Sequence, residues 1–354
     1  MKIVSMRNYP VCILIFLAVF LGFFPNHAIS QGRSKIITIG FYNLENLFDT
    51  IDDPATDDQE FTPSGSGKWD SERYKVKLEH LAEAISLIGS DSVKGGPVII
   101  GLAEVENKQV VEDLISTAPL RNMGYKVVHY DSPDKRGIDV ALIYKASFFK
   151  LTGSKAIPLK INGKLDFFTR DILEVSGTLK GQPLVIFVNH WPSRSKGEKE
   201  SSQLRNAAAD LCRSTVDSIQ KQQPEAGIII MGDLNDDPIN ESLMDHLKTV
   251  TQSGNLKKED LYNPMWMLFK EGIGSLPYKG KWNLFDQIIV SSSLVEKNKK
   301  KYSFYKAGVM KSQMLLEQEG QYAGYPFRSY AGSNYLGGYS DHLPAFIYLV
   351  RNQK

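Results

Sequence analysis

Short polar clusters interrupt this chain at the ends of apolar, strand-like runs, and they constrain its fold more than any other feature. Each follows or opens a segment rich in Ile, Val and Leu, which is typical of a buried strand. The fold must therefore bring polar groups from several strand ends together. The clusters are Asn43 with Glu45, Glu104, Asn189-His190-Trp191, Gly232-Asp233-Leu234-Asn235, Asp286, and Ser340-Asp341-His342. Carboxylates, amides and imidazoles in this pattern indicate one convergent site for a hard metal ion and for hydrolysis.

The first thirty residues differ from the rest. Two basic residues precede an uncharged apolar run over residues 11–24, and the small-residue segment Ala28-Ile29-Ser30 follows. This order matches a secretory signal, so we expect residues 1–30 to be a signal peptide cleaved between Ser30 and Gln31. An uncleaved membrane anchor is the alternative, but the run is shorter than the roughly 20 residues of a bilayer span. We therefore expect a secreted or periplasmic protein with no stable membrane span after cleavage.

Charge and cysteine content restrict the remaining chain. The full sequence has 42 basic and 40 acidic residues, and residues 1–30 remove only Lys2 and Arg7, so the expected mature chain is formally neutral. A neutral chain argues against a surface that coats nucleic acid, so any contact with a polyanion must be local. Cys212 alone remains after cleavage, which excludes an internal disulfide. We expect residues 31–354 to form one catalytic domain that acts as a monomer.

The order of apolar and amphipathic segments predicts the fold class. Apolar residues at spacings of three and four from Tyr74 to Ile88 and from Leu204 to Ile219 predict two long helices, the first capped by Asp70. A shorter helix is predicted over residues 107–118. Predicted strands cover residues 36–42, 97–103, 125–130, 138–144, 171–179, 184–189, 227–231, 285–290 and 345–350. Strict strand–helix alternation is missing, so two packed sheets covered by helices fit better than a doubly wound sheet.

Each cluster alone also has a purely structural interpretation. Glu104 suits Mg²⁺, which takes only one or two protein carboxylates, but it equally suits a helix cap. Asp233 and Asn235 share one face of an extended segment. They could orient an attacking water, or they could form an Asx turn.

The histidine clusters leave similar alternatives. His342 can act as acid or base near neutral pH, with Asp286 as the carboxylate that fixes its tautomer. A serine triad at Ser340 is the rival, disfavoured because no Gly-x-Ser-x-Gly elbow surrounds it. A protonated His190 would stabilise charge on a phosphoryl oxygen. Arg170 would add a fork for phosphate, or would form a surface ion pair.

In this order the motifs resemble the endonuclease/exonuclease/phosphatase superfamily, which includes pancreatic deoxyribonuclease, abasic-site endonucleases, neutral sphingomyelinases and inositol-polyphosphate 5-phosphatases. The resemblance covers residues 36–350. It implies an α/β fold in four layers, with two packed, mainly antiparallel sheets flanked by helices. The motifs are Phe41-Tyr42-Asn43-Leu44-Glu45, Leu102-Ala103-Glu104-Val105, Arg136-Gly137-Ile138-Asp139-Val140-Ala141, Asn189-His190-Trp191, Gly232-Asp233-Leu234-Asn235, Asp286-Gln287-Ile288 and Ser340-Asp341-His342.

The resemblance also implies a phosphoesterase that depends on Mg²⁺ or Mn²⁺, with Ca²⁺ as a further candidate. It makes Glu104 the main metal ligand, with Asn43 and Glu45 beside it and Asp341 next to the metal and phosphate. In some nucleases of the superfamily a Glu orients the histidine at the position of His190. The resemblance further implies that Asp233 and Asn235 position water and phosphate, and that His342 pairs with Asp286. It implies that His190 stabilises the phosphate or the leaving group and that Arg170 contacts the phosphate. Asp139 is the candidate for the residue that orients His190.

Substrate preference is predicted from export and from a few loop charges. We favour a nuclease acting on DNA or RNA, because residues 193–199 and the run Lys297, Lys299, Lys300, Lys301 add local positive charge, although both segments also suit solvated loops. A sphingomyelinase-like or small-molecule phosphodiesterase or phosphatase is the alternative, with residues 263–269 as the one candidate for a membrane-docking hairpin, a segment that equally suits the core. An inactive exported binding protein is the third interpretation, and the competent residue at every catalytic position argues against it.

Overall fold

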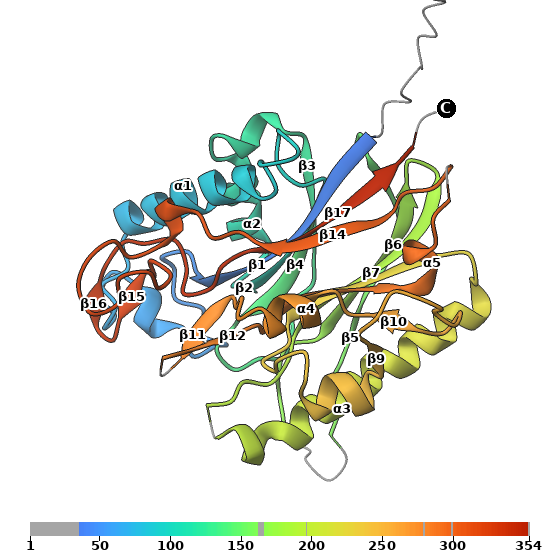
Figure 1. Cartoon of the computed structure of the whole chain (residues 1–354). Coiled ribbons are helices and arrows are strands. Elements are labelled where there is room, and N and C mark those ends of the chain that lie inside the picture. Colours follow the sequence, from blue (N-terminus) through green and yellow to red (C-terminus); the bar gives the residue numbers. More distant parts are fainter. Residues whose placement is uncertain (1–34, 162–165, 196, 279, 299, 353–354) are drawn as a thin grey trace, which may run out of the picture. The chain divides into compact units, whose positions relative to one another are not determined.

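The computed structural model describes residues 35–352 except 162–165, 196, 279 and 299 (Figure 1). The predicted signal peptide and its cleavage point lie outside the described residues. No helix in the described part of the chain is long and apolar enough to cross a membrane.

One sheet contains six strands in the order β14-β17-β1-β2-β4-β3. Its first and last strands in sequence, β1 and β17, pair antiparallel, and β1 pairs parallel with β2. The last strand of the chain, β17, therefore lies inside this sheet, between β14 and β1. The strands are β1 (Lys35–Leu47), β2 (Ile99–Val105), β3 (Tyr125–His129), β4 (Asp139–Lys145), β14 (Ser303–Val309) and β17 (Ala345–Arg351).

The other large sheet contains seven strands in the order β5-β6-β7-β8-β13-β10-β9. β7 and β8 pair parallel, whereas β8 and β13 pair antiparallel. The strands are β5 (Phe149–Ile157), β6 (Ile172–Leu179), β7 (Gln182–His190), β8 (Gly227–Asp233), β9 (Thr249–Val250), β10 (Leu261–Tyr262) and β13 (Asp286–Ser291). Two small hairpins are formed by β11 (Leu276–Tyr278) with β12 (Lys281–Asn283), and by β15 (Tyr330–Ala331) with β16 (Asn334–Tyr335).

Helices cover the outer faces of both sheets. Leu81 and Ile85 of α1 join an apolar cluster with Ile100 of β2, while Ala208 and Cys212 of α3 pack in a second cluster over the other sheet. A third cluster fills the space between the sheets. The predicted four-layer α/β sandwich is confirmed. The helices are α1 (Ser71–Leu87), α2 (Lys108–Ser116), α3 (Glu198–Gln222), α4 (Met265–Lys270) and α5 (Ser292–Val295), with short turns η1 (Gln59–Phe61), η2 (Leu120–Asn122), η3 (Ser242–His246) and η4 (Gln313–Leu315).

Of the two interpretations of residues 263–269, the docking hairpin is wrong and the core segment is confirmed. This segment contains α4, which begins at Met265. Met265 is fully buried between the sheets, and Leu268 and Phe269 pack against the same cluster. The apolar residues here belong to the core, with only Met267 strongly exposed.

Among the described residues, neither loop segment places free positive charge at the convergent strand ends, so the interpretation of solvated loops fits the lysine run better than contact with a phosphate backbone. Arg194 is half-buried and is held within the protein, because it donates to the Asn235 carbonyl at 2.7 Å and to the Asp236 carboxylate at 2.8 Å. The lysine run follows the end of β13 that lies away from Asp286, and Lys301 pairs with Glu225 at 2.9 Å. Since β13 alone spans roughly 17 Å at about 3.4 Å per residue, these lysines lie far from the convergent strand ends; Lys299 lies outside the described residues.

Candidate active site

Three neighbouring strands of the seven-stranded sheet end in polar side chains at the same level. His190 on β7 is in register with Asp233 on β8, and Asp233 is in register with Asp286 on β13. All three are buried. Gly232 permits this close approach, because a Cβ atom there would lie 2.3 Å from the Asn189 carbonyl oxygen.

The six-stranded sheet contributes Asn43 and Glu104 from β1 and β2. The pairing of these strands shifts register after Asn43, and the pairing of β2 with β4 shifts around Glu104. Glu45 and Glu104 have φ values of 50° and 60°, in the left-handed region that non-glycine residues rarely adopt. Bulges re-aim side chains beside active sites, and backbone strain concentrates at functional positions. The irregular backbone at these strand ends therefore indicates a functional site.

Asn43 joins the two sheets at the centre of the site. Its Nδ2 atom donates to Asp233 Oδ2 at 3.0 Å and to Glu104 Oε1 at 3.2 Å. The Glu45 backbone N–H donates to Asn43 Oδ1 at 3.0 Å, which fixes the orientation of the amide. Glu104, the predicted metal ligand on one sheet, and Asp233, the predicted water-positioning carboxylate on the other, are thus both bonded to Asn43.

His342 is held by Asp286, as the sequence predicts. Its Nδ1 atom lies 2.7 Å from Asp286 Oδ2, and the same oxygen accepts a hydrogen bond from Ser275 Oγ. Burial opposes a charged ring, but Asp286, Asp233 and Asp341 outweigh it and raise the pKa of His342 well above its usual value. His342 is therefore an imidazolium near neutral pH.

His190 differs from the protonated imidazole that the sequence suggests. Its Nε2 atom faces Asp233 Oδ2 at 3.6 Å and Glu104 Oε1 at 3.8 Å, while its buried Nδ1 atom has no described partner. Burial, together with the nearby Arg170 and Arg136, lowers the pKa of His190 well below its usual value. The two histidines of the site therefore carry different charges.

Asp233 lies at the point where the other groups converge. Besides Asn43 and His190, its Oδ2 atom has His342 Nε2 at 3.8 Å. Burial raises the pKa of Asp233 to about 7, with Asp286 and Glu104 adding to the rise while His342 opposes it. A carboxyl with this pKa can accept a proton near neutral pH.

Asn235 and Ser340 have mainly backbone partners. Asn235 has a φ of 50°, donates from its backbone N–H to Asp233 Oδ1 at 3.0 Å, and donates from Nδ2 to the Trp191 carbonyl at 3.0 Å. Ser340 Oγ donates to the Asn43 carbonyl at 2.8 Å and accepts from the His342 N–H at 3.1 Å. Ser340 is thus a turn residue, and no imidazole activates it.

Arg170 lies behind His190. It donates to the His190 carbonyl at 3.2 Å, to the Trp191 carbonyl at 2.6 Å and to Asp134 Oδ2 at 3.0 Å. The side chain is buried, so the alternative of a surface ion pair is wrong. Its contacts hold the backbone that carries His190 in place.

Two cations near Glu45 escaped the sequence analysis. Lys77 lies 3.8 Å from Glu45 Oε2 and donates to Ser329 Oγ at 2.6 Å and to the Tyr339 carbonyl at 2.8 Å. Arg328 bridges Asp341 Oδ2 at 2.8 Å and Glu45 Oε1 at 3.5 Å. Lys77 had a signal, since it is a charged residue on the apolar face of the predicted helix. Arg328 lies in a loop without periodicity and had none.

The donor set fits a divalent cation. Glu104, Glu45 and Asp341 supply carboxylate oxygens, which are the hard ligands that Mg²⁺ prefers. Asn43 lies beside them, with its Nδ2 turned toward Glu104 and its oxygen bonded to the Glu45 N–H. Burial raises the pKa of Asp233, and the nearby carboxylates of Asp286 and Glu104 add to the rise, so these carboxylates repel one another. Asp233, Asp286 and His342 also lie close enough together to share an ion.

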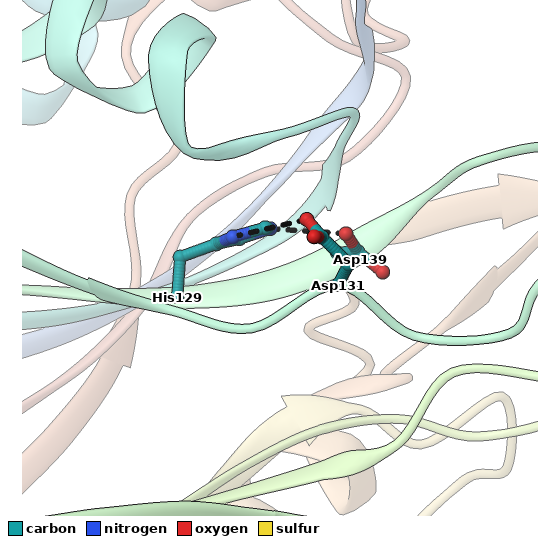
Figure 2. A group of neighbouring side chains, drawn as sticks. All are labelled: His129, Asp131 and Asp139. Carbon is teal, nitrogen blue, oxygen red and sulfur yellow. Dashed lines mark hydrogen bonds and ion pairs between the residues drawn. The ribbon is translucent and has the colours of Figure 1, made fainter. Parts of the chain in front are cut away.

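A second group of ionisable side chains lies at the ends of β3 and β4 (Figure 2). The His129 ring faces Asp139 Oδ2 at 3.0 Å and Asp131 Oδ1 at 3.7 Å. Asp139 also accepts from the N–H of Ser132 at 2.9 Å. The expectation that Asp139 orients His190 is therefore wrong. Asp139 pairs with His129 and anchors the loop between the two strands.

Comparison with known proteins decides the family. A sequence model of the endonuclease/exonuclease/phosphatase family matches residues 38–351. The chain belongs to the endonuclease/exonuclease/phosphatase family. Members of this family are phosphoester hydrolases and generally require a divalent metal ion. No curated protein matches the chain.

Solved structures of this family share the fold. A humanized D. rerio TDP2 with 14 mutations is 15% identical at a TM-score of 0.54, covering 89% of this chain and 98% of that chain. An endonuclease/exonuclease/phosphatase family protein from Bacteroides thetaiotaomicron is 18% identical at a TM-score of 0.54, covering 91% of this chain and 97% of that chain. A mannosyl-6-phosphatase from the same organism is 17% identical at a TM-score of 0.54, covering 88% of this chain and 99% of that chain. At these identities the comparison establishes the architecture.

Proposed function

We propose that this chain is an exported, divalent-metal-dependent phosphoesterase, and that nucleic acid is its principal substrate. One observation carries the chemistry. Asp233 Oδ2 lies within 4 Å of Asn43, His190 and His342, which come from three different elements. A carboxylate surrounded in this way can take a proton from a water that attacks phosphorus.

The residues divide the reaction between them. Asp233 accepts the proton as the water oxygen bonds to phosphorus and the bond to the leaving oxygen breaks. The imidazolium of His342 stabilises the charge on the phosphoryl group and supplies a proton to the leaving oxygen. Neutral His190 donates a hydrogen bond to a phosphoryl oxygen. A divalent ion held by Glu104, with Asn43, Glu45 and Asp341 beside it, would neutralise charge on the phosphate.

An open groove beside the site supports a polymeric substrate. It holds about 880 Å³, and exposed Lys135, Arg136 and Phe168 line it. Three acidic residues, Asp134, Asp166 and Glu200, also belong to its wall, and buried Arg170 is held by Asp134 and two backbone carbonyls. Among the described lining residues, only Lys135 and Arg136 therefore offer exposed positive charge. Cations that follow a phosphate backbone, combined with an aromatic platform for bases, are common in proteins that bind single-stranded nucleic acid. This groove replaces the lysine run as the basis for the nuclease proposal.

A second candidate is a phosphatase for small organic phosphates. It is favoured by a smaller cavity of about 270 Å³ that lies directly beside Glu45 and Asp341. Sphingomyelin hydrolysis is less favoured, because the predicted docking segment is the partly buried helix α4.

A substrate panel tests the proposal. Single-stranded DNA, RNA, sphingomyelin and small phosphate esters would be incubated with Mg²⁺ or Mn²⁺. We expect cleavage of nucleic acid that weakens as salt is added, because backbone contacts release counterions. Hydrolysis of sphingomyelin alone would contradict the nuclease proposal, as would hydrolysis of small esters alone.

A further inference from the structure

A cavity lies between two loops at the edge of the candidate active site. It holds about 270 Å³ and includes Glu45 and Asp341 in its wall. The other walls come from residues 60–69, which precede α1, and from residues 328–333, which lead into β15. A phosphate bound near these carboxylates would have its organic part close to this cavity.

The chemistry of the wall restricts the occupant. Among the described lining residues there is no aliphatic side chain; the wall consists of polar groups with Phe61, Trp69 and Tyr330. An acyl chain would find little apolar surface here. A sugar ring fits better, because each hydroxyl both donates and accepts hydrogen bonds and the C–H faces of the ring can pack on aromatic rings.

Arg328 is the principal polar group of the cavity. Asp341 and Glu45 hold two of its nitrogens, at 2.8 Å and 3.5 Å, while no described residue accepts from Nη1. The side chain is 47% exposed. A guanidinium that is fixed by two carboxylates and retains donors can bind neighbouring oxygens without first losing much side-chain entropy.

The cavity is built before a ligand arrives. The Trp69 indole donates to the Phe48 carbonyl at 3.0 Å, and the Tyr330 hydroxyl donates to the Gly67 carbonyl at 2.9 Å. The rings of Trp69 and Tyr330 lie 6.1 Å apart. These contacts join the two loops, and such preformed walls are typical of small-molecule sites.

We propose that this cavity binds the sugar ring that carries the scissile phosphate, with Arg328 as its main donor. The inference rests on the proposed phosphoesterase function and adds that the group esterified to the phosphate is a sugar. The ring belongs either to a free sugar phosphate or to the terminal nucleotide of a polynucleotide. The groove lined by Arg136 and Phe168 would hold the remainder of a polynucleotide.

The test compares substrates with and without a sugar ring. Phosphate release from mannose 6-phosphate, thymidine 5′-phosphate and n-propyl phosphate would be measured for the wild type and for Ser333→Leu, in which an exposed cavity residue becomes bulky. Ser195→Leu is the matched control, because Ser195 is also exposed and lines the groove instead. Binding of methyl mannoside and thymidine would be followed by saturation-transfer NMR without metal.

We expect the wild type to prefer a ring-bearing substrate, and Ser333→Leu to lower that preference about tenfold through KM, with loss of the NMR signal. The faster ring-bearing substrate identifies the source of the ring. An equal loss for all three substrates, or the same loss in Ser195→Leu, would overturn the proposal. Cleavage of single-stranded DNA with metal present is measured in parallel and tests the proposed function separately. If DNA is cleaved but none of the three monoesters is hydrolysed, the proposed function stands, and the NMR result alone decides whether the cavity binds a sugar; if DNA is not cleaved either, the proposed function fails.

Discussion

His342 Nδ1 and Asp286 Oδ2 lie 2.7 Å apart in a buried pair, and no comparable carboxylate faces His190 Nδ1 in the described structure. The pair makes His342 the charged histidine, while burial beside Arg170 leaves His190 neutral. Titratable groups whose environments move their pKa values apart usually divide acid and base roles. The asymmetry around His190 and His342 therefore determines which histidine can donate a proton to the leaving group.

Replacement of Asp286 by Asn tests this division. The variant removes the main charge that raises the pKa of His342, so the ring loses its proton at lower pH. We expect kcat to fall by roughly 10²–10⁴ and the alkaline limb of the pH–rate profile to move toward neutrality. An imidazole NMR titration of His342 would check the cause. An unchanged alkaline limb would show that His342 does not act as the charged group.

Metal binding by Glu104 can be tested with Glu106 as a matched control. Glu104 faces the site, whereas Glu106, two residues on, accepts from the Asp49 N–H. Loss of groups that merely support metal ligands lowers affinity about 10–100-fold, so Glu104→Gln should weaken Mg²⁺ or Mn²⁺ binding by more than about a hundredfold. Glu106→Gln should bind as the wild type does. Isothermal titration calorimetry measures both, and equal affinities would remove Glu104 from the metal site.

The stability of the metal-free protein should depend on Asp233. Its folded pKa of about 7 exceeds the unfolded value of 3.8, so the folded state holds a proton that the unfolded state releases. The free energy of unfolding therefore decreases as pH rises from about 4 to about 7. Asp233→Asn should flatten this slope without abolishing it, because burial raises the pKa of Glu106 to about 7 as well.

Thermal unfolding in EDTA across this pH range measures the slope. A wild-type melting temperature that rises steadily toward pH 7 would contradict the assignment. A slope identical in Asp233→Asn would show that other groups cause the dependence.

Lys77 should be a large contributor to stability around the site. Its ammonium group is buried beside the Glu45 carboxylate. Removing one partner of a buried pair leaves an uncompensated charge and typically costs about 3–5 kcal/mol. Lys77→Met should destabilise the protein by this amount in urea unfolding, and the additional change Glu45→Gln should restore part of the loss. A cost below about 1 kcal/mol would show that Glu45 takes up a proton or is solvated instead.

The sequence predicted the parts of the fold and site that follow an uninterrupted apolar run. Asp233, for example, follows the buried strand at 227–231, and the run itself indicated where the side chain would emerge. The edge strands β5 and β14 were missed because only one of nine residues in β5 and two of seven in β14 are buried, so neither has a continuous apolar run.

Contacts between distant loops could not be predicted from local pattern. Arg328 reaches Glu45 across 283 positions, and Ser275 reaches Asp286 through a hairpin base. Neither residue has a period or a motif that signals its role. The charge of His190 was also beyond local analysis, because burial and Arg170 determine it together.

The central claim is that this site hydrolyses phosphoesters with a divalent metal ion. The most direct test is the rate of bis-p-nitrophenyl phosphate hydrolysis with Mg²⁺ or Mn²⁺, then after EDTA, then after metal is restored. We expect turnover that EDTA abolishes and added metal recovers, with no turnover by Glu104→Ala or His342→Ala although both remain folded by circular dichroism. Hydrolysis that continues unchanged in EDTA, or wild-type rates in either variant, would contradict the account.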